Sequence, residues 1–223
     1  MPYPNNPTGA VINRESLLKI RDVILKHNLI VISDEVYSEL TYSDEGHVSI
    51  ASLPDMWERT VYLSGFSKAF AMTGWRIGYI ATPAPLMENM VKIHQYAIMC
   101  ASVQAQVAAE EALKRGREDN YADIVTMRES YNRRRRLMLD GVRKMGLSCF
   151  EPLGAFYVFP SIAKTGLTSE VFCERLLKEK EVACVPGTAF GACGEGFIRC
   201  CYATALDKLT VALSRIDDFL QHL

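Results

Sequence analysis

The sequence predicts an α/β protein, and three observations lead to this prediction. Amphipathic stretches of helical length alternate with short apolar runs of strand length, an order typical of α/β folds. The run LIVIS at residues 29–33 is continuously apolar up to its last residue, as expected for a strand buried on both faces. After Gly146, strand-like runs again alternate with helical stretches, so we expect a second, smaller α/β unit there.

Composition and charge make several classes of protein improbable. The 223 residues are 49% hydrophobic and 23% charged, which is typical of a globular protein. A net charge of −1 gives no strong attraction to nucleic acid or membranes, and the apolar runs are too short to cross a bilayer. The seven cysteines are odd in number and form no CxxC, so we expect reduced, buried thiols in a cytoplasmic protein without a metal site.

The first half of the chain opens on a turn rich in Pro, Asn and Gly at residues 1–9. Asn13 is placed to cap a helix that ends near residues 27–28, and the strand LIVIS follows it. The other elements expected in this half are strands at 61–63 and 77–81, an irregular loop at 38–60, and a helix at 85–115 with Leu86, Met90, Ile93 and Ala97 facing the core.

The second half begins with one long amphipathic helix expected at 121–145. Within it, the run from Arg133 to Arg136 splays around the helix, which favours a solvated face with ion pairs to residues such as Glu129 or Asp140 over a nucleic-acid patch. The other elements expected here are strands at 147–150, 155–159, 182–185 and 197–202, a helix capped by Ser169 that ends near residue 180, and a helix at 206–220.

The stretch SGFSKAFAMTGWRIGY, at residues 64–79, contains the strongest candidates for chemistry. Lys68 lies among small, weakly polar residues, where desolvation favours the neutral, nucleophilic amine. Arg76 offers a guanidinium that suits a phosphate dianion, although most Lys and Arg residues are simply solvated. Asp34 and Tyr37 directly follow the LIVIS strand, and ligands of open α/β sheets bind beyond the carboxyl ends of strands.

Six motifs then occur in an order that resembles one known family. They are NNPTG, DEVY, SGFSKAFAMTGWRIGY, PLGAFYVFP, VPGTAFG and GFIRCCYA. This series resembles the aspartate-aminotransferase-like, fold-type I class I/II aminotransferases, which depend on pyridoxal 5'-phosphate (PLP). The resemblance covers the whole chain. It implies part of the large-domain sheet of the PLP-dependent transferase fold at 1–115 and the smaller α/β C-terminal domain at 116–223, with 121–145 as the connecting helix.

The resemblance also implies a role for each matching residue. Lys68 would form the Schiff base with the cofactor aldehyde and then shuttle a proton once it is displaced. Asp34 would pair with the protonated pyridine nitrogen and so keep the ring an electron sink. Tyr37 and Asn6 would both hydrogen-bond to the phenolic oxygen of the ring.

Three further residues match positions that hold the charged groups of cofactor and substrate. Arg76 and Ser67 would bind the cofactor phosphate, although a local turn-capping role for Ser67 stays open. Arg199 would bind the α-carboxylate of the substrate in a bidentate manner, and Asn6 would touch the same carboxylate.

The implied reaction is PLP-dependent transamination between an L-amino acid and a 2-oxo acid, of aspartate or aromatic type. The family resemblance further implies a cytoplasmic homodimer in amino-acid metabolism and biosynthesis. Two alternatives stay open: a PLP-dependent C–S β-lyase, and a non-catalytic aminotransferase-like ligand-sensing domain. Because the family places further residues before the NNPTG loop, we expect a truncated form that is inactive as a transaminase by itself.

Overall fold

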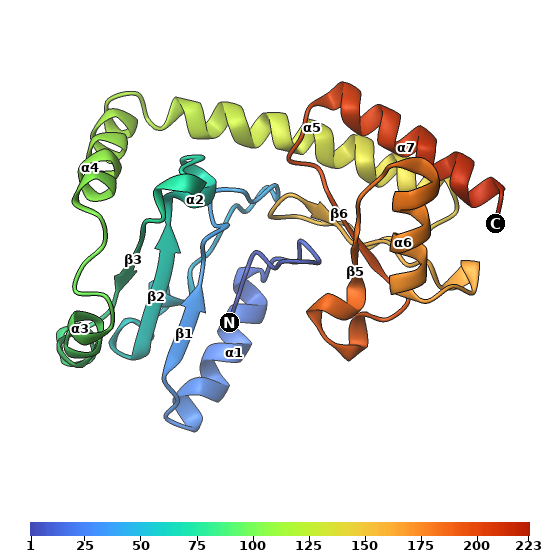
Figure 1. The fold of residues 1–223 in the computed structure, drawn as a ribbon. Coiled ribbons are helices and arrows are strands. Elements are labelled where there is room, and N and C mark those ends of the chain that lie inside the picture. Colours follow the sequence, from blue (N-terminus) through green and yellow to red (C-terminus); the bar gives the residue numbers. More distant parts are fainter. The chain divides into compact units, whose positions relative to one another are not determined.

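The computed structural model describes residues 1–223 and contains two three-stranded sheets (Figure 1). By their contacts, the residues separate into two units. The first comprises Met1–Pro4 and Val11–Arg128, and the second comprises Asn5–Ala10 and Glu129–Leu223. The turn Asn5–Ala10 therefore groups with residues from the far end of the chain rather than with its neighbours in sequence.

The sheet of the first unit positions most of the predicted site residues. Its strands are β1 (Val31–Asp34), β2 (Thr60–Gly65) and β3 (Gly78–Ala81), in the order β1-β2-β3. β1 and β2 are parallel, with Asp34 opposite Leu63, whereas β3 is antiparallel to β2. Parallel neighbours end at the same edge of a sheet, and the short helix α2 (Phe66–Ala69) begins at this edge, at the tip of β2 (Figure 1).

Helix α1 (Arg14–Lys26) begins as the sequence predicts. The Asn13 side chain caps it by accepting a hydrogen bond from the Ser16 N–H at 2.9 Å. Its apolar stripe buries Leu17 and Ile24, and burial of one such side chain contributes about 1.5–3 kcal/mol. The other buried members of this core cluster are Tyr3, Val31, Ile50, Leu53 and Met56. Two short 3₁₀ helices, Ile50–Ser52 and Trp57–Arg59, lie in the segment predicted as an irregular loop.

The prediction that β1 is buried on both faces is wrong. Val31 and Ser33 are buried, but Ile30 and Ile32 are 64% and 59% exposed. A continuous apolar run indicates that both faces of a strand are suited to burial. In this chain only one of the two faces is covered.

The predicted helix at 85–115 is in fact two helices, α3 (Ala84–Ala97) and α4 (Val103–Glu118). The break includes Met99, whose backbone is left-handed with φ of 63°. No residue of α3 is buried, so the predicted core positions in it are wrong, and Ile93 is 72% exposed. By contrast, α4 packs Ala105 and Ala109 into a core cluster with Phe66, Met72 and Ile77.

The second unit contains strands β4 (Tyr157–Val158), β5 (Val185–Pro186) and β6 (Ile198–Cys201), antiparallel in the order β4-β6-β5. Three helices accompany them: α5 (Ala122–Lys144), whose first residues belong to the first unit, α6 (Ser169–Lys180) and α7 (Leu206–Gln221). The rings of Phe172 on α6 and Phe219 on α7 meet edge to face, with centroids 5.2 Å apart. The prediction of a strand at 147–150 is wrong, because only an isolated bridge joins Cys149 to Pro160.

Two predicted details of the second unit also need correction. The N-cap of α6 is Thr168, which accepts from the Val171 N–H, and not Ser169. The arginine run on α5 is not uniformly solvated, because Arg135 is only 7% exposed. Arg135 Nη1 donates to Glu151 Oε1 at 3.0 Å and to the Pro152 carbonyl at 3.1 Å.

Composition led to expectations about membrane spans and about the thiols. None of the helices is both long and apolar enough to span a membrane. The expectation of buried thiols holds for Cys173 and Cys200 alone. The five other cysteines are partly or fully exposed: Cys100, Cys149, Cys184, Cys193 and Cys201.

Candidate active site

Three predicted site residues lie at the carboxyl edge of the first sheet. Asp34 ends β1, Tyr37 lies in the turn after it, and Lys68 lies in α2 directly after β2. Because β1 and β2 are parallel neighbours, both connections leave the sheet at one edge. The Lys68 Nζ lies 5.4 Å from the centre of the buried Tyr37 ring. The first unit thus brings an amine, a phenol and a carboxylate to the same edge of the sheet.

Arg76 and Ser67 are connected through Thr73. The Arg76 Nη1 donates to the Thr73 carbonyl at 2.9 Å, and the Thr73 hydroxyl donates to the Ser67 carbonyl at 3.1 Å. Arg76 has a left-handed backbone with φ of 53°, a conformation that is uncommon away from glycine. Sequence reasoning missed Thr73, which links the Arg76 side chain to the backbone of Ser67.

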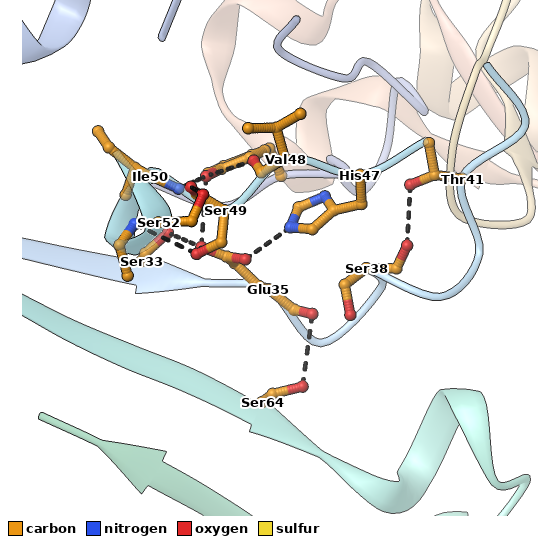
Figure 2. A network of polar contacts seen from close by, with 12 residues as sticks. Ser33, Glu35, Ser38, Thr41, His47, Val48, Ser49, Ile50, Ser52 and Ser64 are labelled. Carbon is orange, nitrogen blue, oxygen red and sulfur yellow. Dashed lines mark hydrogen bonds and ion pairs between the residues drawn. The ribbon is translucent and has the colours of Figure 1, made fainter. Parts of the chain in front are cut away.

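Glu35, the neighbour of Asp34, is the centre of a buried polar network (Figure 2). Its side chain is fully buried. Figure 2 shows the carboxylate directed toward Ser33, Ser49 and His47. The Ser33 and Ser49 hydroxyls each donate to Oε1 at 2.8 Å, and His47 Nε2 lies 2.5 Å from Oε2. A buried carboxylate is tolerated only with such partners.

Tyr3 completes this network from the N-terminal segment. Its hydroxyl lies 3.3 Å from Glu35 Oε1 and accepts a hydrogen bond from the Ile50 N–H at 2.7 Å. Burial, together with the nearby Glu35 carboxylate, raises the pKa of Tyr3 well above its ordinary value. Because Glu35 is anchored inside the unit, Asp34 on the opposite face of the strand is left exposed, and its Oδ1 accepts from the Val36 N–H at 3.3 Å.

The other predicted residues, Arg199 and Asn6, meet within the second unit. Arg199 lies on β6, and its Nη1 donates to Asn6 Oδ1 at 2.9 Å. The guanidinium carbon lies 4.5 Å from the centre of the Tyr157 ring and 4.9 Å from that of Phe190, close enough for cation–π attraction. The Arg199 Nε is buried and has no hydrogen-bond partner. Sequence reasoning missed Tyr157 and Phe190 as partners, although both lie in motifs that it identified.

The turn that presents Asn6 is fixed by its own side chains and by a tight backbone contact. Asn5 Oδ1 accepts from the Thr8 hydroxyl at 2.8 Å. Gly9 has φ of 69°, and its carbonyl accepts hydrogen bonds from the N–H groups of Leu153 and Gly154, both at 2.9 Å. A Cβ on Gly9 would lie 2.3 Å from the Cβ of Pro152. Only glycine therefore fits at this position.

Known sequences that are similar to this chain are aminotransferases. The profile of the family described as Aminotransferase class I and II matches residues 1–216. The chain is 48% identical to an aspartate aminotransferase of Pyrococcus abyssi, over 98% of this chain and 56% of that protein. It is 45% identical to aromatic-amino-acid aminotransferase 2 of Thermococcus litoralis, again over 98% and 56%. The chain thus spans little more than half the length of these relatives.

Solved structures show the same likeness. The aromatic aminotransferase from Pyrococcus horikoshii OT3 superposes with a TM-score of 0.94 at 49% identity, over 99% of this chain and 58% of that chain. The aspartate aminotransferase from Thermotoga maritima gives a TM-score of 0.89 at 40% identity, over 99% and 55%. These likenesses confirm the predicted α/β fold as part of the fold that both structures share.

Proposed function

Because this chain belongs to the class I and II aminotransferase family, we propose that it supplies residues for PLP-dependent transamination between an L-amino acid and a 2-oxo acid. The observation that carries the proposal is the placement of Lys68, Tyr37 and Asp34 at one edge of one sheet. The relatives named for aspartate and aromatic amino acids support a substrate of one of these types. The chain spans 56% of each of them, so the activity is proposed for the whole protein rather than for these 223 residues measured alone.

The donor set of the first unit fits PLP group by group. The cofactor carries an aldehyde, a pyridine nitrogen, a phenolic oxygen and a phosphate. Lys68 offers an amine for the aldehyde, Asp34 a carboxylate for the nitrogen, and Tyr37 a hydroxyl for the phenolic oxygen. Ser67 and Arg76 offer a hydroxyl and a guanidinium for the phosphate, and guanidinium groups bind phosphate in a fork geometry.

When bound, PLP supplies an electron sink that stabilises the negative charge left at the substrate Cα. In this proposal the Lys68 amine takes the proton from that Cα and holds it. The Asp34 carboxylate places a negative charge where the ring nitrogen binds. Tyr37 and Asn6 orient the ring through its phenolic oxygen.

Arg199 is proposed to bind the α-carboxylate of the substrate. Its buried Nε has no acceptor in the structure, and a buried donor without a partner costs about 1–3 kcal/mol. A carboxylate would supply that acceptor and bind the guanidinium with two parallel hydrogen bonds. Asn6 holds the Nη1 of the same guanidinium and thereby fixes the direction in which it donates.

We propose four further properties on the basis of family membership. The whole protein acts as a homodimer in the cytoplasm, and it serves amino-acid biosynthesis. Residues 1–115 are part of the cofactor-binding large domain, and residues 116–223 are the small domain with its connecting helix at 121–145.

Cofactor binding tests the proposed function first. The purified chain is mixed with PLP, its visible absorption is recorded, and borohydride then fixes the cofactor on the lysine that holds it. We expect the label on Lys68 and no visible band for Lys68→Ala, while Lys92→Ala, which removes an exposed lysine of α3, keeps the band. Label spread over surface lysines would contradict the assignment.

The nature of the reaction is tested by the fate of the substrate. Exchange that requires a 2-oxo acid is the expected result for a transaminase. Release of pyruvate from cystathionine without a 2-oxo acid would instead identify a C–S β-lyase. Tight binding of an amino acid without turnover in the whole protein would favour a ligand-sensing domain.

A further inference from the structure

Two cysteines of the second unit face each other across neighbouring strands. Cys184 directly precedes β5, Cys200 lies on β6, and their sulfur atoms are 3.5 Å apart. The strand register pairs Val185 with Arg199, so one residue further along Cys184 lies opposite Cys200. Both thiols are reduced in the structure.

The position of this pair in the ladder suits a covalent bond. The Gly187 N–H donates to the Phe197 carbonyl at 2.8 Å, and hydrogen-bonded and non-hydrogen-bonded pairs alternate along antiparallel strands. If the alternation is followed back from the hydrogen-bonded pair of Gly187 and Phe197, Cys184 and Cys200 form a non-hydrogen-bonded pair. Cα atoms in such pairs are about 4.5 Å apart, within the range of roughly 4.4–6.8 Å found for disulfides. The sulfur atoms need to approach by only about 1.5 Å to reach bonding distance.

The two thiols differ in exposure and acidity. Cys200 is buried on the central strand of the sheet, whereas Cys184 is only partly buried beside the edge strand. The hydrogen bond between the two thiols lowers the pKa of Cys184. The same bond and burial raise the pKa of Cys200. Cys184 is thus the thiol that reaches a reagent and ionises first, and the thiolate is the nucleophile in disulfide exchange.

We propose that Cys184 and Cys200 are a redox-modification site that forms a reversible disulfide with low-molecular-weight disulfides as the oxidant. The Cys184 thiolate attacks one sulfur of the reagent, which breaks the reagent's S–S bond and releases one thiol. Cys200 then loses its proton and attacks the Cys184 sulfur, which releases the second thiol. Two protein thiols are oxidised to one disulfide, and one reagent disulfide is reduced to two thiols.

The disulfide has a consequence for the neighbouring residue that rests on the proposed function. Cys200 directly follows Arg199, and Cys184 directly precedes the residue opposite Arg199. Because the bond restrains the strand pair next to Arg199, we expect it to shift the guanidinium relative to Asn6, Tyr157 and Phe190. We expect the oxidised chain to bind a dicarboxylate such as maleate about tenfold more weakly, as for the loss of one hydrogen bond to a charged group.

The test uses a chain in which the three exposed cysteines are removed by Cys100→Ser, Cys193→Ser and Cys201→Ser. Trypsin cleaves after Arg199, so Cys184 and Cys200 fall in separate peptides, each with a single cysteine in this background. After treatment with oxidised glutathione we expect the mass to fall by two hydrogen atoms and these two peptides to be linked. Dithiothreitol should reverse both changes.

Single variants in this background test the order of attack. Cys200→Ser should accumulate glutathione on Cys184, whereas Cys184→Ser should leave Cys200 reduced. Cys173→Ser is the matched control, because Cys173 lies in the same core and burial raises its pKa to about 12, and it should still form the disulfide. Absence of the 184–200 link, or a link to Cys173 in its place, would overturn the proposal.

The proposed role of Arg199 and its link to the disulfide are tested by different results. If the reduced chain does not bind maleate, the proposed role of Arg199 is wrong, while the peptide mapping still decides the disulfide. If the disulfide forms and the affinity for maleate is unchanged, the link between the redox site and Arg199 is wrong.

Discussion

At the scale of single residues, Glu35 shows how one buried side chain fixes the direction of its neighbour. Successive side chains of a strand point to opposite faces. Ser33 of β1 points inward to the Glu35 carboxylate, which Ser49 and His47 also hold, so Asp34, the next residue of the strand, faces outward. The backbone is held as well, since the Glu35 N–H donates to the Leu63 carbonyl at 2.8 Å. The orientation of the proposed cofactor-binding carboxylate therefore depends on a residue that does not touch the cofactor.

We expect Glu35→Gln to destabilise the first unit by about 1–3 kcal/mol, because an amide cannot accept all the hydrogen bonds that the buried carboxylate accepts. Both tryptophans, Trp57 and Trp75, lie in the first unit. Their fluorescence during urea unfolding therefore reports on this unit. The control Glu39→Gln changes an exposed carboxylate and should alter stability by less than about 0.5 kcal/mol. Equal effects of the two substitutions would count against the network.

The sequence motifs predicted residues whose neighbours in sequence already indicate their roles. They did not predict residues whose partners lie far away in sequence. Lys68 and Arg76 stand in one short stretch. The partners of Glu35, by contrast, come from segments as far away as Tyr3 and Ser49. Nothing in a linear pattern shows that these segments converge on one carboxylate. Arg199 was predicted, but not the rings of Tyr157 and Phe190 beside it.

At the scale of elements, apolar periodicity predicted where helices and strands lie better than which faces are covered. The start of α1 at Asn13 and the positions of β2 and α7 follow from capping and pattern. The pattern of α3 is also amphipathic, yet none of its residues is buried. Apolar periodicity indicates that one face of a helix is suited to packing against another element. That element need not belong to the same chain.

The turn Asn5–Ala10 gives a prediction at this scale. Gly9→Ala should destabilise the chain by more than Gly166→Ala, a matched control with φ of 72° and no atom near the added Cβ. Both changes strain a left-handed backbone, at a cost of about 1 kcal/mol. Only Gly9→Ala also collides with Pro152 and Gly154, which adds roughly 1–3 kcal/mol. Urea unfolding followed by circular dichroism measures the difference, and equal midpoints would show that the turn does not pack as described.

At the scale of the whole molecule, the exposed apolar side chains are concentrated on two surfaces of the first unit. One is lined by Val23, Leu29, Ile30 and Ile32, beside α1 and β1. The other consists of α3 and the segment after it, with Ile93, Tyr96, Ile98 and Met99. Contiguous apolar surfaces of this kind are uncommon on monomeric proteins and favour association.

We therefore expect the purified 223-residue chain to self-associate at micromolar concentration and to bind a hydrophobic dye. The double substitution Ile93→Lys with Tyr96→Lys should weaken both effects, because it places charge on the α3 surface. Val211→Lys is the control, since it alters an exposed apolar residue on α7. Sedimentation velocity and dye fluorescence report the outcome. A monomer that binds no dye would contradict this reading of the exposed surface.

The hydrogen bond between Arg199 and Asn6 has a consequence for the timing of folding. It joins residues that are 193 positions apart in the chain. A ribosome makes Asn6 long before Arg199, so the turn Asn5–Ala10 waits without its partners while the residues between them are synthesised. Residues up to Arg128, which complete the first unit, emerge long before. Maturation of the second unit is therefore a late event, and the nascent turn must remain available until the carboxyl-terminal strand has been translated.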